Sequence, residues 1–369
     1  MVNVACFVKK HMVLFSFIFI FIVLAFVSPK NAYASFFTIE WKSISALAGL
    51  SIITTGMQKS RIFHKVAKAW AKRLKSERSL ALFLVIFSGL ISTILTNDVA
   101  LFITVPFTLS LGSFIENDLS KLIIFEAMSA NVFSTLTPIG NPQNMFLWHK
   151  MDISFFRFIT VAFPVFSIMA AILVIFTCVL FSRKEIVLRE DADEDIVVDK
   201  KLFLFSSVSL ALYIIMLQFK LNYAAFVIFL VLYIIFFKDI VKNAYWTLPL
   251  IFVAISLDFH TLASLKPVKD LLSAMISNSP RRVFAVSSIS SQLISNVPAT
   301  VLILNFTHRF KDILYGVNVG GNGTVISSLA NIIAIDLSND NSLWMKFHKY
   351  SLPFFLVSFS IICAIYKFI

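Results

Sequence analysis

The strongest constraint on the fold is a series of apolar runs that are too long and too poor in charge for a soluble core. Two of them, residues 202–219 and 221–237, follow each other almost without interruption. Of the 369 residues, 59% are hydrophobic, 14% are charged and 41 are Phe, a composition typical of helices in a bilayer. We therefore expect an all-α polytopic membrane protein, whose net charge of +12 reports on topology and not on nucleic acid binding.

The first apolar run, residues 12–27, follows a short basic stretch and precedes the triplet Ala32-Tyr33-Ala34. This arrangement fits a cleaved signal peptide with an A-x-A site, and it also fits an uncleaved first span. We prefer a span for residues 1–34, because the crossing count given below requires it.

A polar, helix-breaking stretch, TPIGNPQN at residues 137–144, interrupts apolar sequence. Proline and glycine at membrane depth free backbone groups, which persist only where they line a cavity or meet a ligand. Asn141 followed by Pro142 suits the cap and first turn of a new helix. We expect two half-helices that meet at an unwound middle; the alternative is an ordinary kinked membrane helix.

A second copy of this stretch favours the first interpretation. Residues 316–331, GVNVGGNGTVISSLAN, align without gaps on residues 129–144, SANVFSTLTPIGNPQN. The second copy has Val and Leu where the first has its prolines, and we expect its glycines to loosen it instead. The alignment pairs Asn131 with Asn318, Thr137 with Thr324 and Asn144 with Asn331.

Two further apolar runs are interrupted near their middle. Residues 80–111 contain Thr96-Asn97-Asp98, and residues 283–304 contain Ser295-Asn296-Val297-Pro298. Each side of the first break has about 15 residues, whereas a span needs about 20. We therefore predict re-entrant hairpins whose tips are buried in protein.

The order of the parts repeats along the chain. Each half has two spans, a basic amphipathic segment, an interrupted hairpin, a broken helix and a final span. We predict a first transmembrane repeat at 1–182, a charged cytoplasmic loop and linker span at 183–219, and a second repeat at 220–369. The linker adds one crossing, which inverts the second repeat relative to the first, as in secondary transporters.

This scheme predicts nine crossings of a cell inner membrane, with a cytoplasmic N-terminus and a periplasmic C-terminus. Lys and Arg are more frequent in the segments that the scheme places inside the cell, which agrees with the positive-inside rule, although the second half follows it weakly.

The four breaks supply groups that bind small ions. Half-helix N-termini suit an anion, and unwound carbonyls with Asn or Thr oxygens suit Na⁺. We expect no resident metal and no cofactor, only a coupling ion, H⁺ or Na⁺, with Na⁺ at the hairpin tips. No Lys or Arg occurs at any break. The candidate substrate- or ion-binding residues are Thr96, Asn97, Asp98, Thr137, Gly140, Asn141, Asn144, Ser295, Asn296, Asn318, Thr324, Ser328 and Asn331.

The carboxylates differ in what their positions predict. Asp98 lies at a hairpin tip and is a candidate proton or cation carrier; the alternative is a capping Asp at the start of residues 99–111. We expect Glu126 to reach the membrane interface, and Asp258 and His260 to lie at the end of a span. The acidic run at 190–195 fits a solvated linker.

The motifs ISTILTNDVALFITVPFTLSL, TPIGNPQN, SSQLISNVPA and GVNVGGNGTVISSLANI resemble the paired signatures of the ion transporter superfamily. The likeness is to its citrate transporter-like branch, with arsenite permeases, sodium/proton antiporters and divalent-anion/sodium symporters, and within it to short bacterial inner-membrane members. It implies an inverted-repeat transporter with re-entrant hairpins, often a homodimer, that works by alternating access. The symporters have Ser-Asn-Thr at both tips, whereas this chain has Thr96-Asn97-Asp98 and Ser295-Asn296-Val297. The first tip is more similar to the arsenite permease and antiporter side.

These features predict a secondary active transporter of a small anion, either citrate- or dicarboxylate-like or inorganic, coupled to H⁺ or Na⁺. The alternatives are arsenite or antimonite efflux and Na⁺/H⁺ antiport. A membrane-embedded enzyme is disfavoured, because the polar groups at depth are mostly amides and hydroxyls, which bind but rarely catalyse. The expected partners are a small ionic substrate and the lipid bilayer.

Overall fold

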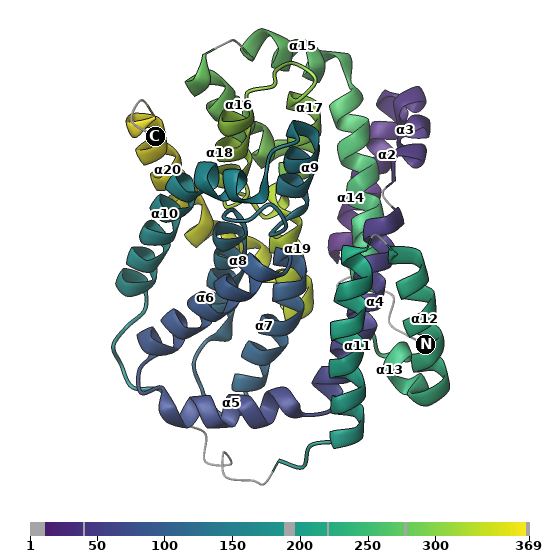
Figure 1. Ribbon diagram of the computed structural model, residues 1–369, viewed down its shortest axis with the longest axis vertical. Helices are drawn as coiled ribbons and strands as arrows, with labels where there is room; N and C mark the ends of the chain where they lie inside the picture. The colour runs from purple at the N-terminus through teal and green to yellow at the C-terminus, as the bar shows by residue number, and fades with distance from the viewer. Residues whose placement is uncertain (1–11, 40, 188–195, 220, 277–278, 367–369) are drawn as a thin grey trace. The chain divides into compact units, whose positions relative to one another are not determined.

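The computed structural model describes residues 12–39, 41–187, 196–219, 221–276 and 279–366 (Figure 1). Within these ranges every regular element is a helix, apart from an isolated bridge between Ser76 and Glu185. The predicted all-α architecture is confirmed. The acidic run at 190–195, predicted to be a linker, lies outside the described residues.

The helices form two compact units, and each unit draws on both predicted repeats. Unit 1 comprises Met1–Lys72 and Leu188–Leu262, and unit 2 comprises Arg73–Val187 and Ala263–Ile369. The helices of unit 1 are α2 (Met12–Val27), α3 (Pro29–Ser35), η1 (Phe36–Thr38), α4 (Trp41–Lys59), α5 (Ile62–Arg73), α11 (Lys200–Gln218), α12 (Asn222–Phe236), α13 (Lys238–Lys242) and α14 (Thr247–Ser264).

Unit 2 contains both hairpins, both broken helices and the last helix. Its elements are α6 (Glu77–Ile94), α7 (Asn97–Leu111), α8 (Leu119–Ser134), α9 (Pro142–Met151), α10 (Phe155–Leu180), α15 (Lys266–Met275), α16 (Pro280–Ile294), α17 (Asn296–Ile303), α18 (Phe310–Gly320), η3 (Val325–Ser327), α19 (Leu329–Ser338) and α20 (Leu343–Ile365).

Several helices have the length and composition of membrane spans. In the described part of the chain, five single helices qualify. The helices Pro29–Thr38 and Trp41–Lys59, which meet at 60°, make a sixth candidate if the bent pair is counted as one span. These helices confirm a polytopic membrane protein, while the number of nine crossings stays a prediction. The five single helices that qualify are Glu77–Ile94, Phe155–Leu180, Lys200–Leu217, Lys238–Ser264 and Leu343–Ile365.

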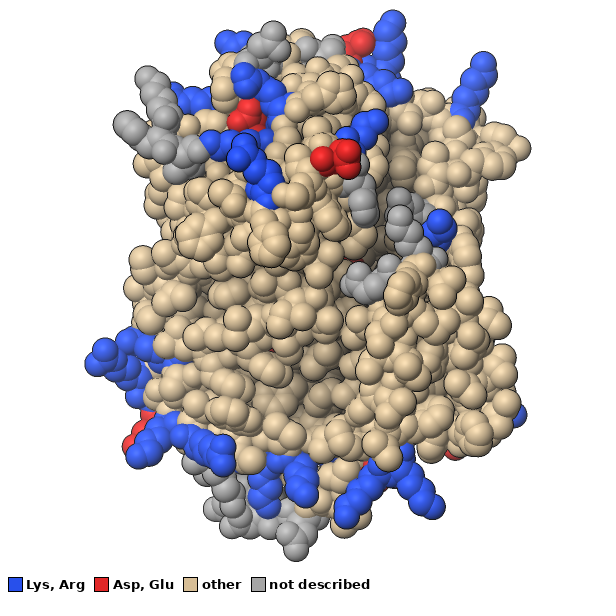
Figure 2. All heavy atoms as spheres, in the orientation of Figure 1, with Lys and Arg blue, Asp and Glu red and all other residues tan. Residues whose placement is uncertain are grey.

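The surface of unit 2 has the pattern expected of a protein in hydrocarbon. On the face seen in Figure 2, charged side chains of this unit gather near its two ends, and the surface between them is uncharged. Large apolar side chains of unit 2 are exposed, among them Leu90 on α6, Ile175 on α10 and Leu356 on α20. An apolar surface of this kind is stable against lipid tails and not against water.

In unit 2 the chain turns back at two tips. Helices α6 and α7 form one hairpin, α16 and α17 form the other, and Figure 1 shows them entering the unit from opposite ends. The hairpins therefore bring their tips to the middle of the unit, beside the broken helices.

Helix α6 begins with a reciprocal cap, in which the Ser79 N–H donates to Ser76 Oγ at 3.2 Å and the Ser76 N–H donates to Ser79 Oγ at 3.1 Å.

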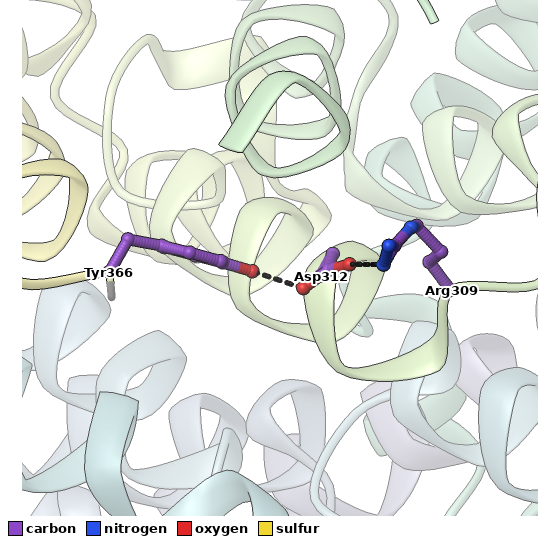
Figure 3. Close-up of polar contacts among 3 residues, drawn as sticks. All are labelled: Arg309, Asp312 and Tyr366. Atoms are coloured by element: carbon purple, nitrogen blue, oxygen red, sulfur yellow. Dashed lines mark hydrogen bonds and ion pairs between the residues drawn. The ribbon is translucent and has the colours of Figure 1, made fainter. Parts of the chain in front are cut away.

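A polar clamp fixes the start of α18 to the end of α20. Asp312, in the first turn of α18, accepts a hydrogen bond from the Tyr366 hydroxyl (Figure 3). Its other oxygen, Oδ2, lies 3.4 Å from Nη1 of Arg309. Asp312 is 6% exposed, so the ion pair and the hydroxyl together offset the loss of its water.

The expectation for Glu126 is wrong. Glu126 does not reach an interface: it is 0% exposed, because α6 and α7 pack over that part of α8. Asp258 and His260 lie in the second half of α14, where Asp258 is 2% exposed, and their place at the end of a span stays a prediction. In both cases the sequence shows the distance from the end of an apolar run, but it does not show whether protein or lipid lies beside it.

Candidate functional site

Two equivalent hydrogen bonds join the broken helices of unit 2. Asn131 on α8 donates from Nδ2 to Oδ1 of Asn331 on α19 at 2.7 Å. Asn318 on α18 donates from Nδ2 to Oδ1 of Asn144 on α9 at 2.8 Å. Asn131 pairs with Asn318 in the sequence repeat, and Asn144 pairs with Asn331. Exchanging the two halves therefore maps one contact onto the other.

The unwound backbone at each break is held by the amide of the half-helix that follows. Asn144 Nδ2 donates to the carbonyls of Ser134 at 3.1 Å and Thr137 at 3.1 Å. Asn331 Nδ2 donates to the carbonyls of Gly321 at 3.1 Å and Thr324 at 3.2 Å. Breaks at these two places are thus confirmed, and the protein's own amides meet the carbonyls that each break frees.

The residue before each second half-helix completes the pattern. Asn141 Nδ2 donates to Asn318 Oδ1 at 3.0 Å, and Ser328 Oγ donates to Asn131 Oδ1 at 2.9 Å. Asn141 also caps α9, since its Oδ1 accepts from the Asn144 N–H at 2.8 Å, with Pro142 in the first turn. The predicted cap is confirmed.

The first hairpin tip is bonded directly to this cluster. Asn97 Nδ2 donates to Asn131 Oδ1 at 3.1 Å, and the Asn97 N–H donates to the Gly140 carbonyl at 2.7 Å. A Cβ at Gly140 would collide with the backbone of Ser134, so this position admits only glycine without a shift of the unwound segment. Asn97 thus bridges the hairpin and the broken helix.

The second tip approaches its own broken helix with a different backbone. Ser295 has φ 68° and ψ 156°, a conformation that L side chains rarely adopt. Asn296 is 2% exposed, and a Cβ at Gly321 would lie 3.1 Å from its Nδ2. Within the described residues, the structure shows no bond from Asn296 to Asn318 that would match Asn97 to Asn131. The two tips are therefore related but not identical.

A threonine fastens each broken helix to its hairpin. Thr137 Oγ1 donates to the Thr93 carbonyl at 2.8 Å, and Thr324 Oγ1 donates to the Gln292 carbonyl at 3.0 Å. Gln292 Oε1 also accepts from the Thr324 N–H at 2.7 Å. The sequence reasoning missed Gln292. Its position four residues before the tip asparagine, which matches that of Thr93 before Asn97, is the signal that could have found it.

Asp98 is a first-turn residue of α7 and not its cap. Thr96 caps this helix, because its Oγ1 accepts from the Val99 N–H at 3.3 Å. The Asp98 N–H donates to Asn97 Oδ1 at 3.0 Å. The capping alternative for Asp98 is therefore wrong. Among the residues described, its half-buried carboxylate has no hydrogen bond or ion pair.

The predicted site residues thus gather around one buried centre, with Asp98 and Ser295 at the hairpin tips. Asn131 was recognised in the repeat but not included among the candidates; it bonds Asn97, Asn331 and Ser328 at once. The half-helices α7, α9, α17 and α19 all begin at these breaks. Their N-termini place the partial positive charge of four helix dipoles at the centre.

The comparisons with known proteins identify the family of this chain. A family model described as "Citrate transporter" matches residues 4–309. This chain belongs to the citrate transporter family. The match ends before α18, so it does not include the second broken helix. The predicted family resemblance is confirmed.

Two of the relatives reported for this chain match most of its length. The chain is 36% identical to "Inner membrane protein YbiR" of Escherichia coli over 332 residues, which are 89% of this chain and 87% of the relative. It is 34% identical to "Uncharacterized transporter MJ0456" of Methanocaldococcus jannaschii, over 88% of this chain and 89% of the relative. It is 28% identical to "Silicon efflux transporter LSI3" of Oryza sativa, over 39% of this chain and 29% of the relative. The protein is a multi-pass inner membrane transporter and not an enzyme.

Proposed function

We propose that this member of the citrate transporter family is a secondary active transporter of a small anion, coupled to H⁺ or Na⁺. The observation that supports it best is the exchange-related pair of contacts, Asn131 with Asn331 and Asn318 with Asn144. Alternating access requires two arrangements of similar energy, and an inverted repeat supplies them when its halves exchange contacts.

The chemistry of the centre favours an anion that is held by dipoles. Four half-helices begin at the breaks, several asparagine side chains lie beside them, and no Lys or Arg is present there. A carboxylate or an inorganic oxyanion would replace the amide contacts between the two broken helices. The tip residues Asn97, Asp98 and Asn296 offer oxygens to a coupling cation.

A second candidate function is efflux of arsenite, antimonite or a similar small hydroxide, with Na⁺/H⁺ antiport as a further alternative. The lack of Lys and Arg at the breaks favours it, because an uncharged hydroxide needs hydrogen bonds and no counter-charge. The name of the rice relative, a silicon efflux transporter, points to the same chemistry in that protein.

Flux measurements in proteoliposomes test these proposals. Citrate, succinate, arsenite, silicic acid and Na⁺ would be compared, each with and without an imposed pH or Na⁺ gradient. Flux of one anion that follows a gradient supports the first proposal, and gradient-driven flux of arsenite or silicic acid supports the second. The matched control is Asn131→Ala combined with Asn318→Ala, which removes both exchange-related contacts. Equal flux in the control and the unmodified protein would place the site elsewhere.

A further inference from the structure

A second polar cluster lies in the first hairpin and first broken helix, away from the breaks. Glu126 is at the middle of α8 and is fully buried. Its Oε1 accepts a hydrogen bond from Thr108 Oγ1 at 2.8 Å, whereas its Oε2 is buried without a partner in the described part of the chain. Ser88 Oγ donates to the Glu126 carbonyl at 3.2 Å, and Thr104 Oγ1 donates to Ser88 Oγ at 3.5 Å.

No charged group in the described part of the chain is bonded to this carboxyl. Six helices pack against α8: α6, α7, α10, α18, α19 and α20. None of the titratable groups on them or on α8 forms a hydrogen bond or ion pair with Glu126 within the described residues. An ionised carboxylate in such a position would be costly, so the neutral acid is the stable form in this conformation. The groups concerned are Glu77, Arg78, Asp98, Lys121, Arg157, Cys178, Lys311, Asp312, Tyr315, Asp336, Lys346, His348, Lys349, Tyr350 and Cys363.

The other repeat shows that the fold does not need an acid here. Glu126 lies five residues before Asn131, and Ile313 lies five residues before Asn318. Ile313 is 0% exposed and occupies the equivalent place on α18. Thr104 likewise corresponds to Ile303, since each lies seven residues after its tip asparagine. Aliphatic side chains therefore fill the second copy of the Glu126 and Thr104 positions, whereas Ser88 and Thr108 correspond to Ser287 and Thr307. The hydroxyls recur in the second repeat, and the acid belongs to the first repeat alone.

We propose that Glu126 is the proton-binding site of this transporter, with Thr108 and Ser88 as the hydroxyls that position it. The inference rests on the proposed function and deepens it, because it names H⁺ as the coupling ion and Glu126, in place of Asp98, as its carrier. On release, the bond between Oε2 and hydrogen breaks, the electron pair stays on the oxygen, and the proton goes to water.

The position of Glu126 links its protonation to the candidate site. Five residues of α-helix separate it from Asn131, which is about 7.5 Å along the axis of α8. Asn131 holds Asn331 of the opposite repeat. An ionised Glu126 needs water or a cation at its free oxygen, so its deprotonation favours a conformation in which α6 and α7 no longer cover α8. That movement changes the contact between Asn131 and Asn331.

Infrared spectroscopy of the full-length protein in detergent tests the site without any substrate. The protein at neutral pH should show the C=O stretch of a protonated carboxyl that is absent from Glu126→Gln and shifted in Thr108→Val, which loses the hydrogen bond. Asp98→Asn, the matched control, should keep this band unchanged. If Glu126→Gln does not fold, the shift in Thr108→Val decides. No band that responds to either variant would overturn the proposal, and so would a band removed by added Na⁺ at constant pH.

Transport gives the second measurement. In proteoliposomes, the ratio of flux with a pH gradient to flux without one should fall to about 1 in Glu126→Gln and stay at the unmodified value in Glu116→Gln, an exposed position in unit 2. The probe is whichever of citrate, succinate, arsenite or silicic acid the unmodified protein carries. If it carries none of them, the proposed function fails while the infrared result still supports or overturns the proton site. Retained coupling in a folded Glu126→Gln would refute the carrier role.

Discussion

The side-chain amide of Asn318 donates a hydrogen bond of 2.8 Å to Oδ1 of Asn144 and thereby ties the second broken helix to the first. The same bond recurs, with the halves exchanged, from Asn131 to Asn331 at 2.7 Å. Each asparagine therefore serves two purposes, because it stabilises an unwound backbone segment or helix and joins the two repeats.

The first prediction concerns this coupling. Asn144→Ala and Asn318→Ala should each destabilise the protein by about 1–3 kcal/mol, because each leaves a buried amide group unpaired. The double variant should lose less than the sum, with a coupling energy of about 0.5–3 kcal/mol. Thermal unfolding in detergent would measure this. Asn243→Ala, an exposed position in unit 1, is the control. Additive losses would mean that the two side chains do not interact.

Transport should depend on the paired amides as well. Asn97→Ala, Asn144→Ala, Asn296→Ala and Asn331→Ala should each abolish flux while the protein still elutes as a folded species in detergent. Each of these side chains lies at an unwound point or tip that has an equivalent in the other half. Unchanged flux when both members of a pair are replaced would show that substrate binds elsewhere.

The two hairpin tips should respond in opposite ways to glycine. Ser295 has φ 68°, which strains an L side chain by about 1–3 kcal/mol. Glycine relieves that strain but adds about 0.5–1 kcal/mol of backbone entropy cost. We expect Ser295→Gly to raise the melting temperature slightly. Thr96→Gly, at φ −80° and with a capping hydroxyl, should lower it. A destabilised Ser295→Gly would contradict the tip geometry.

The cap of α7 gives a separate prediction. Because Thr96 caps this helix, Thr96→Ala should reduce stability by about 1 kcal/mol. Asp98→Asn should change stability by less than about 0.5 kcal/mol, since its carboxylate has no bond among the described residues. Parallel melting curves of the two variants would settle which residue caps the helix.

Asp340, in the loop before α20, should make the stability of the protein depend on pH. Burial raises the pKa of its carboxyl, but hydrogen bonds from Ser342 and Ser120 and the charge of Lys346 outweigh it, so the pKa falls below its ordinary 3.8. A carboxyl whose pKa is lower in the folded state than in the unfolded state stabilises the protein at pH values above its unfolded-state pKa. This stabilisation is lost as the pH falls through the folded-state pKa. The unmodified protein should therefore be more stable than Asp340→Asn at pH 7, and the difference should shrink in acid below about pH 4. A difference that does not vary with pH would contradict this.

Topology is open to a direct test. A fluorescent protein that matures only in the cytoplasm, fused after Ile369, should stay dark if the chain crosses nine times from a cytoplasmic N-terminus. Bright cells at normal expression would exclude this orientation.

Much of the site followed from the sequence, because a break in an apolar helix is visible in one dimension. The unwound stretches, the cap at Asn141 and the pairing of Asn131 with Asn318 all depend on local residue types and a gapless repeat. The burial of Glu126 and Asp258 could not be predicted from local residue types, since an apolar run has the same sequence pattern whether lipid or protein covers it. Gln292 was missed for a related reason: its role depends on how closely α16 approaches the second broken helix.

The amides that hold the unwound carbonyls also determine how the transporter behaves between cycles. Asn144 and Asn331 satisfy the broken backbone with groups from the protein itself, so the centre needs no occupant to stay folded. An arriving solute must compete with those internal donors, which lowers its affinity and shortens its residence. Under the proposed symport of an anion with H⁺ or Na⁺, the carrier returns empty after each delivery, and this arrangement suits the return step as well as the loaded one.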